Sequence, residues 1–150
     1  MQGAETRLWL QRAKTEGDGM ASFPGVHHVA VTVTDLDRSA AWYRKLFDAD
    51  PVLDEDTGAF YHKVWAFDNG SLFGIHGHKA TDPKDKFSEF RVGLDHVSFG
   101  VGSRAELEEW KKRLDDMGYE NGGVVDANYG SGLSFRDPDN NALEIFAPPA

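Results

Sequence analysis

Three side chains that can bind a divalent metal lie on strands that the sequence predicts. His28 and His96 fall in short runs where apolar residues alternate with small or polar ones, and Glu144 stands between two apolar residues. Side chains alternate between the two faces of a strand, so all three are expected on the face opposite the apolar residues. A carboxylate within a strand is costly unless it is paired or bound to a metal. Two imidazoles and a carboxylate converging from three strands would bind a divalent metal and leave positions for substrate, water or dioxygen.

The two histidines belong to an internal repeat. A shift of 68 residues superposes His28 on His96 and continues through the segments that follow. The other matched pairs include Val29 and Val97, Val33 and Val101, Trp42 and Trp110, Leu46 and Leu114, and Asp48 and Asp116. Because one shift carries both a strand and the helix after it, the sequence predicts two copies of one module.

Each module is predicted to contain a strand, a helix and three further strands. Helix starts are indicated by Asp35 or Thr34 in the first module and by Ser103 in the second, where Glu106 completes a capping box. The strands are expected at residues 26–34, 52–53, 60–67 and 72–78, and at residues 94–101, 124–125, 133–136 and 141–147. The expected fold class is α+β, with two tandem βαβββ modules that form a mixed sheet around a central cleft.

The domain organisation follows from these elements. Residues 1–22 are expected to be an N-terminal extension, either disordered or a short helix. Residues 23–150 are expected to form a single domain, with module one at 23–80, a linker at 81–91 and module two at 92–150.

Composition excludes several classes of function. The formal charge is −9, from 16 basic and 25 acidic residues, which disfavours nucleic acid and anionic membranes as partners. There is no cysteine, so any metal must be held by His, Asp, Glu or backbone oxygen. No apolar run reaches the roughly 20 residues of a membrane span, and the first residues lack the apolar core of a signal peptide. The expected location is the cytoplasm.

Several segments carry a resemblance to a known family. They are His28–Ser39 with Trp42 and Tyr43 after it, Gly93–Val97, and Phe135–Phe146. They resemble the vicinal oxygen chelate superfamily of glyoxalases, bleomycin-resistance proteins, fosfomycin-resistance enzymes and extradiol dioxygenases. The resemblance covers nearly all of residues 23–149. It implies a glyoxalase/dioxygenase-like fold, metal ligands at His28, His96 and Glu144, and a homodimer.

One position departs from the glyoxalase pattern. Glyoxalases carry a Glu or Gln as a further ligand near the end of the first module, and the hairpin turns align Gly74 with Glu144 there. Glycine has no side chain to coordinate, so the ligand set is more similar to the three-ligand arrangement of dioxygenases and fosfomycin-resistance enzymes. His76 and His78 follow on the same face. Either could take the vacant position, and His76 is the predicted catalytic acid or base.

Five further residues are predicted to contact substrate. They are His62, Trp65, Arg91, Tyr129 and Arg136. Arg91 would either hold an anionic substrate or pair with Glu89 to fix the linker. For Trp65 the competing interpretation is a place in the core, because alternating aromatic residues usually pack there.

The sequence thus predicts a divalent-metal-dependent enzyme that acts on a small oxygenated molecule. The metal would be Fe²⁺, Mn²⁺, Zn²⁺ or Ni²⁺, and the reaction a dioxygenation, a lyase reaction or an isomerisation. The alternative is a non-catalytic small-molecule binding or resistance protein of the same fold. It would hold a flat ligand between aromatic residues such as Trp65 and Phe60, across a dimer interface.

Overall fold

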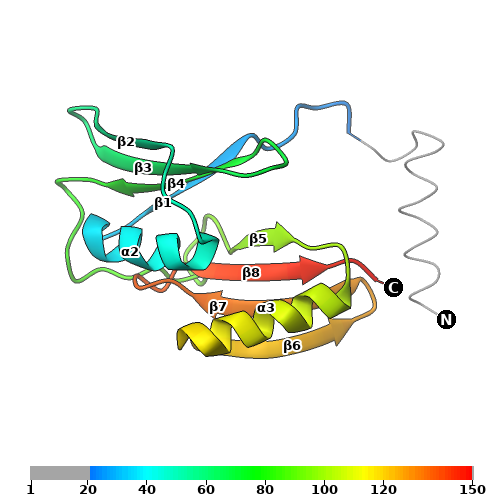
Figure 1. Ribbon diagram of the computed structural model, residues 1–150. Helices are drawn as coiled ribbons and strands as arrows, with labels where there is room; N and C mark the ends of the chain where they lie inside the picture. The colour runs from blue at the N-terminus through cyan, green and yellow to red at the C-terminus, as the bar shows by residue number, and fades with distance from the viewer. Residues whose placement is uncertain (1–20, 150) are drawn as a thin grey trace. The chain divides into compact units, whose positions relative to one another are not determined.

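The computed structural model describes residues 21–149, which form two compact units (Figure 1). The first unit contains Val26–Val97 and Arg136–Leu143. The second contains Ser98–Phe135 and the chain from Glu144 onward, with the described residues before Val26. Residues 1–20 of the expected N-terminal extension lie outside the described residues. No helix within the described part is long and apolar enough to cross a membrane.

The first unit is built on a four-stranded sheet. Its strands are β1 (His28–Thr32), β2 (Leu53–Asp56), β3 (Tyr61–Ala66) and β4 (Leu72–Gly77). They lie in the order β1-β4-β3-β2, with β1 parallel to β4 and the other neighbours antiparallel. The parallel pairing requires a crossover between β1 and its neighbour, and helix α2 lies within that crossover.

Helix α2 (Leu36–Phe47) covers one face of this sheet. It begins at Asp35, whose side chain accepts a hydrogen bond from the third backbone N–H beyond it, as the sequence predicts. The Tyr43 and Phe47 rings contact Trp65 of β3 and Phe73 of β4, with ring centroids 5.0–6.0 Å apart. This aromatic cluster forms the core of the first unit between α2 and the sheet.

The turn at residues 137–141 also belongs to the first unit. Asp139 accepts hydrogen bonds from the Thr34 N–H at 3.1 Å, from the Thr34 hydroxyl, and from Arg38 at 3.0 Å. Asp137 accepts one from the Tyr43 hydroxyl at 2.8 Å. Two buried carboxylates therefore tie the C-terminal turn to α2, Asp139 at the start of the helix and Asp137 in its second half, although about a hundred residues separate them in sequence.

The second sheet repeats the plan of the first. Its strands are β5 (Val97–Gly100), β6 (Asn121–Ala127), β7 (Gly130–Arg136) and β8 (Ala142–Ala147). Their order, β5-β8-β7-β6, matches that of the first sheet strand for strand. The α+β class and the repeated module predicted from the sequence are therefore confirmed.

Helix α3 (Arg104–Met117) accompanies the second sheet (Figure 1). Ser103 caps its start by accepting from the Glu106 N–H, and Gly118 ends it at a φ of 76°, both as the sequence predicts. Leu107 and Leu114 are fully buried and form its apolar face.

The sequence placed one important strand boundary too early. The predicted strand at residues 94–101 begins only at Val97, because Gly93 has a φ of +151° and the chain before Val97 turns. His96 therefore immediately precedes β5. Leu94, expected within the strand, is 53% exposed.

Candidate functional site

His76 lies on the uncovered face of the first sheet. It sits on β4, stacked against Phe60 with ring centroids 4.4 Å apart and planes 11° from parallel. A Cβ built on Gly74 would lie 3.6 Å from its Nε2 and 3.7 Å from the Cβ of Ala30 on β1. The imidazole thus lies beside Gly74, and a Cβ at that position would make only an ordinary van der Waals contact with it.

The surroundings of His76 favour its neutral form. Burial lowers the pKa of this imidazole, and the charges of His62, His78 and His28 lower it further. A histidine with a lowered pKa is neutral at pH 7 and can accept a proton. This agrees with the predicted role of His76 as an acid or base.

His62 joins His76 on the same face. Its ring meets the His76 ring edge to face, with centroids 5.4 Å apart, and its Nε2 lies 3.0 Å from Oε1 of Glu55. The structure therefore groups His62, His76 and Phe60, three residues that the sequence places on one face.

Neighbouring residues of the second unit orient the carboxylate of Glu144. It lies on β8 between Leu143 and Ile145, which are both buried. The Ser98 hydroxyl donates a 2.8 Å hydrogen bond to Oε1 of Glu144. A Cβ on Gly132 would come within 2.8 Å of Oε2, so a side chain there would force the carboxylate to move aside. The second sheet thus holds Oε1 by the hydrogen bond from Ser98 and leaves space for Oε2 beside Gly132.

The two histidines predicted as ligands are each held by the residue before them. Nδ1 of His96 lies 2.6 Å from Oδ1 of Asp95, and Nδ1 of His28 lies 3.0 Å from Nδ1 of His27. Histidines that bind metals commonly have their second ring nitrogen held in this way.

The donor set fits a divalent transition metal in its chemistry. Imidazole and carboxylate ligands suit Fe²⁺, Mn²⁺, Zn²⁺ and Ni²⁺. His28 and His96 lie in the first unit and Glu144 in the second. Among residues 21–149 the structure gathers no three His, Asp or Glu side chains into a metal-binding group. The metal site therefore remains a prediction.

Trp65 does not lie where the sequence predicted. Its side chain is 1% exposed, and its indole N–H donates to the Ala49 carbonyl at 2.9 Å. The prediction that Trp65 contacts substrate is wrong, because α2 covers the face of β3 that carries it. The competing interpretation, a place in the core, is correct.

Arg136 holds the connection between β4 and β5. It donates to Glu89 at 2.7 and 3.1 Å and to the Asn140 carbonyl at 3.2 Å. The hydrogen bond from Arg136 lowers the pKa of Glu89 to about 2. Glu89 thus pairs with Arg136, whereas the sequence offered Arg91 as its partner. Arg91 instead approaches Asp85 at 3.4 Å.

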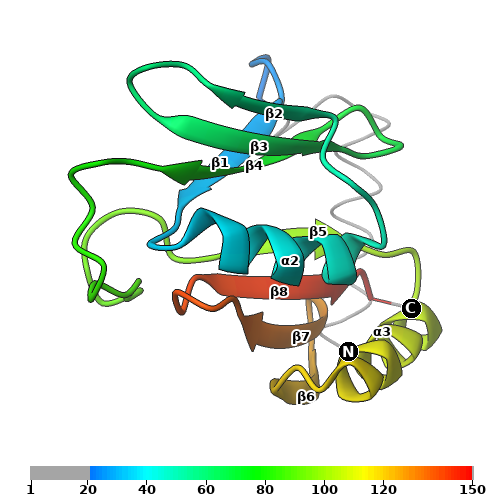
Figure 2. The same cartoon turned by 60° about the vertical axis from the view of Figure 1, so that its left-hand side comes forward.

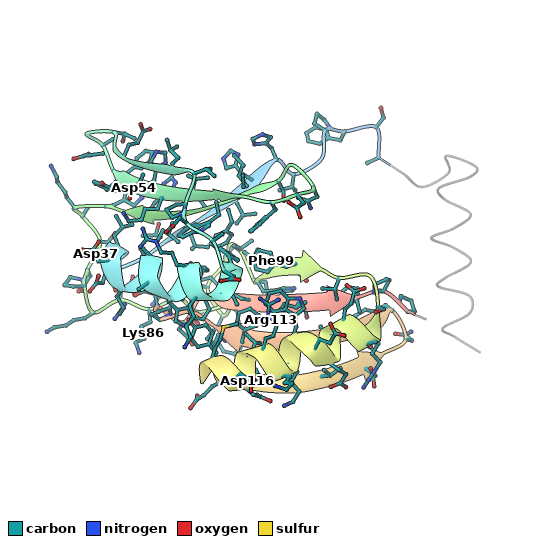
Figure 3. The ribbon with its side chains drawn as sticks, in the orientation of Figure 1. Asp37, Asp54, Lys86, Phe99, Arg113 and Asp116 are labelled. Atoms are coloured by element: carbon teal, nitrogen blue, oxygen red, sulfur yellow. The ribbon has the colours of Figure 1, made fainter. Side chains whose placement is uncertain are left out.

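Arg91 lines a pocket in the first unit. The pocket has a volume of about 310 Å³ and lies beside β1, bounded by Ala30 and Thr32 of the uncovered sheet face. Figure 2 shows the long connection from β4 to β5 that supplies much of its wall, including Lys86, labelled in Figure 3. The remaining lining residues include Thr34, Thr81, Asp85, Phe87, Leu94 and Asn141. The lining thus holds two cations, Lys86 and Arg91, and two carboxylates, Asp85 and Asp139, which pair with Arg91 and Arg38.

Tyr129 belongs to the second unit. It is 62% exposed and stacks on Phe146, with centroids 6.3 Å apart and planes 12° from parallel. Phe146 is two residues from Glu144 on β8, so the two side chains share a face. The contact of Tyr129 with substrate stays a prediction.

Sequence reasoning missed three residues of these surroundings. Asp95 could have been found, because the 68-residue shift that pairs the histidines also pairs it with His27. Ser98 lies two residues from His96 and could have been matched to Glu144 only if the neighbouring strand were known. Lys86 gives no sequence signal, since it stands in a charged surface connection.

Known proteins are similar to this chain over most of its length. The metallothiol transferase FosB of Bacillus licheniformis is 25% identical over 126 residues, covering 81% of this chain and 73% of FosB. A glyoxalase/bleomycin resistance protein/dioxygenase domain from Frankia sp. EAN1pec is 33% identical, with a TM-score of 0.76, covering 85% of this chain and 99% of that one.

A third similar protein was solved with bound ligands. It is a mutant of the fosfomycin resistance protein FosX from Listeria monocytogenes, complexed with Mn(II) and 1S,2S-dihydroxypropylphosphonic acid. It is 22% identical, with a TM-score of 0.59, and covers 85% of this chain and 93% of its own, so the likeness is one of fold.

The family model for the glyoxalase/bleomycin resistance protein/dioxygenase superfamily matches residues 25–145. This range includes both modules and all three predicted metal ligands. The chain belongs to the glyoxalase/bleomycin resistance protein/dioxygenase superfamily.

Proposed function

We propose that this protein is a divalent-metal-dependent enzyme that acts on a small oxygenated molecule, with His28, His96 and Glu144 as metal ligands. The observation that carries the proposal is the position of Glu144. The Ser98 hydroxyl orients Oε1 of this carboxylate, and Gly132 carries no side chain where Oε2 lies. The contacts that hold the Nδ1 atoms of His28 and His96 support the same assignment.

His76 and Phe60 would have separate roles beside the metal. A divalent metal, when bound, supplies a Lewis acid that stabilises negative charge developing on a substrate oxygen. His76, neutral and half-buried, accepts a proton from the substrate or from an attacking nucleophile. Phe60 holds the His76 ring in one plane by stacking on it.

We further propose a small anion as the substrate. The pocket of about 310 Å³ has a suitable size for a molecule of a few carbon atoms. Its lining carboxylates, Asp85 and Asp139, pair with Arg91 and Arg38, and Lys86 adds a further positive charge. The relatives support this choice, because FosX is described as a fosfomycin resistance protein bound to a phosphonic acid. FosB is named a metallothiol transferase, and the FosX ligand is a vicinal diol, so opening of an epoxide on a small phosphonate by a thiol or by water is the first reaction to test. The nucleophile bonds to one ring carbon, the C–O bond at that carbon breaks, and the freed oxygen takes the proton of the nucleophile. Dioxygenation, lyase reactions and isomerisation are the reactions to test next.

The proposal is tested by metal content. Protein purified without a histidine tag or chelator should contain about one divalent metal per chain by elemental mass spectrometry, and His96→Ala should lose it. Asp116→Ala is the control, since Asp116 lies on α3 and pairs with Lys112 (Figure 3). Iron would direct the assays to oxygen uptake with catechols, and manganese, zinc or nickel to phosphonate, lyase and isomerase substrates. Wild-type protein that binds none of these ions after soaking would overturn the proposal.

The oligomeric state and location belong to the same proposal. The family resemblance supports a homodimer, and a cytoplasmic location is proposed beside it. Sedimentation equilibrium on the full chain should give twice the chain mass of 16.6 kDa, and a monomer at micromolar concentration would contradict this.

The alternative function, non-catalytic binding of a small molecule, is weakened by the position of Trp65. It requires a flat ligand between Trp65 and Phe60, but Trp65 is buried and Phe60 already stacks on His76. If the metal test fails, Tyr129 and Phe146 are the aromatic pair to examine with flat ligands.

A further inference from the structure

The residue before each predicted histidine ligand contacts that ligand through Nδ1. Asp95 approaches His96 at 2.6 Å, and His27 approaches His28 at 3.0 Å. The 68-residue shift that aligns His28 with His96 also aligns His27 with Asp95. The same contact therefore occurs at the same position of both modules, although the residues that make it differ.

The Asp95 contact determines which nitrogen of His96 carries the proton. An ionised carboxylate can only accept hydrogen bonds, so Nδ1 of His96 must be the donor. A neutral imidazole protonated on Nδ1 presents its lone pair at Nε2. That tautomer is the one that coordinates a metal through Nε2.

The contact has little structural value in itself. The side chains of Asp95 and His96 are 74% and 46% exposed, and Asp95 stands outside the strands. Exposed ion pairs contribute little to stability. Removing the Asp95 carboxylate should therefore leave the fold intact.

We propose that Asp95 is a positioning residue that fixes the tautomer and orientation of His96 for metal binding. This rests on the proposed function, in which His96 is a metal ligand. His27 takes the corresponding place beside His28, but an imidazole can either donate or accept, so it specifies the tautomer less strictly. The first module thus has an imidazole at the orienting position and the second has a carboxylate.

The first test needs no metal. Long-range ¹H–¹⁵N correlation spectra of the metal-free full chain near pH 8 report the tautomer of each histidine, and His96→Gln identifies the His96 signals. Wild-type protein and Asp116→Ala should show His96 protonated on Nδ1. Asp95→Ala should shift His96 toward the Nε2-protonated form, and Asp95→Asn, which keeps an acceptor oxygen, should retain part of the wild-type pattern. An unchanged tautomer in Asp95→Ala would overturn the proposal.

The second test measures Mn²⁺ and Zn²⁺ affinity by competition with a chelator. Asp95→Ala should bind roughly 10- to 100-fold more weakly than wild type, which is the usual effect of removing such a partner. Asp95→Asn should lose less, and Asp116→Ala nothing. A changed tautomer with unchanged affinity would overturn the positioning role. A wild-type chain that binds neither ion would overturn the proposed function itself, a failure distinct from an unchanged tautomer.

The His27 contact gives an internal comparison. His27→Ala should alter the tautomer of His28 and leave that of His96 unchanged, with a smaller loss of metal affinity than Asp95→Ala. Equal losses in both variants would contradict the difference proposed between the modules.

Discussion

The hydroxyl of Ser98 lies 2.8 Å from Oε1 of Glu144 and donates a hydrogen bond to it across neighbouring strands of the second sheet. The other oxygen, Oε2, occupies space that a side chain at Gly132 would fill. Oε1 is thus held by a hydrogen bond, and Oε2 has room because residue 132 carries no side chain. The orientation of the carboxylate can therefore be altered without changing Glu144.

Gly132→Ala should displace the Glu144 carboxylate while preserving the fold. The new methyl group would lie 2.8 Å from Oε2, the flexible end of a side chain, which can move aside. Metal affinity should fall roughly 10- to 100-fold, as measured by chelator competition. The control is Gly122→Ala, whose methyl group would make an ordinary 3.8 Å contact with a backbone oxygen. Equal affinity in the two variants would contradict the proposed role of Glu144.

His76→Gln should lower kcat about 100- to 10,000-fold once a substrate is identified, because it removes the proton acceptor. The pKa of His76 is lowered from 6.5, so wild-type activity should persist below the pH at which an ordinary histidine becomes protonated. Rates of the wild type and of His78→Gln between pH 5 and 8 provide the comparison. If His78→Gln lost the activity and His76→Gln kept it, the assignment would be wrong.

The same pKa shift predicts how stability depends on pH. Because the pKa of His76 is lower in the folded protein, the unfolded chain binds the proton more tightly. Stability should therefore fall as the pH drops below about 6.5, and this loss should be smaller in His76→Gln. Urea unfolding of both proteins between pH 5 and 8 checks the slope. Parallel curves would show that burial does not suppress the charge on His76.

Arg91→Ala and Lys86→Ala should raise KM for an anionic substrate several-fold and leave metal affinity unchanged. Both side chains line the pocket beside β1. The ion pair of Arg91 is with Asp85, which is not a predicted metal ligand. The control is Lys112→Ala on α3, which removes one positive charge far along the chain. A change in KM that is equal for all three variants would indicate only the effect of net charge.

Glu89→Gln should loosen the connection between β4 and β5. The Phe87 N–H donates to the Asp139 carbonyl at 2.9 Å, and the Glu89–Arg136 pair holds that segment in place. Hydrogen exchange at the Phe87 amide should accelerate. The pKa of Glu89 is about 2 in the folded protein. The stability that its ionised form contributes is therefore fully present above its ordinary pKa of 4.5 and is lost as the pH falls through 2. If Arg136→Ala instead raised KM without altering exchange, Arg136 would be the substrate contact that the sequence predicted.

Tyr43→Phe should destabilise the fold by about 1–3 kcal/mol, because it removes a donor from the buried carboxylate of Asp137. Burial already raises the pKa of Asp137, although Tyr43 and Asn141 donate to the carboxylate and oppose the rise. Urea unfolding measures the loss, and Tyr129→Phe, at a 62% exposed position, should change little. Equal stability of Tyr43→Phe and wild type would show that another group replaces the lost hydrogen bond.

The sequence by itself determined the features that depend on local signals. The 68-residue repeat predicted the strand–helix–three-strand module, and both sheets have the same strand order. Asp35, Ser103 and Gly118 fixed the predicted helix ends through contacts within one turn. The β7–β8 turn was predictable because Asn tolerates the left-handed conformation, and Asn140 has a φ of 67°.

Only the tertiary structure decided which face of a strand is covered and which charged groups meet. Alternation assigns Trp65 to one side of β3, but whether that side faces a helix depends on where α2 packs. Glu89 pairs with Arg136, 47 residues away, instead of with nearby Arg91, because the β7–β8 turn folds back onto the first unit. The Ser98–Glu144 contact likewise spans 46 residues and depends on strand pairing. Sequence patterns record the period of each element, whereas such contacts arise from the packing of elements distant in the chain.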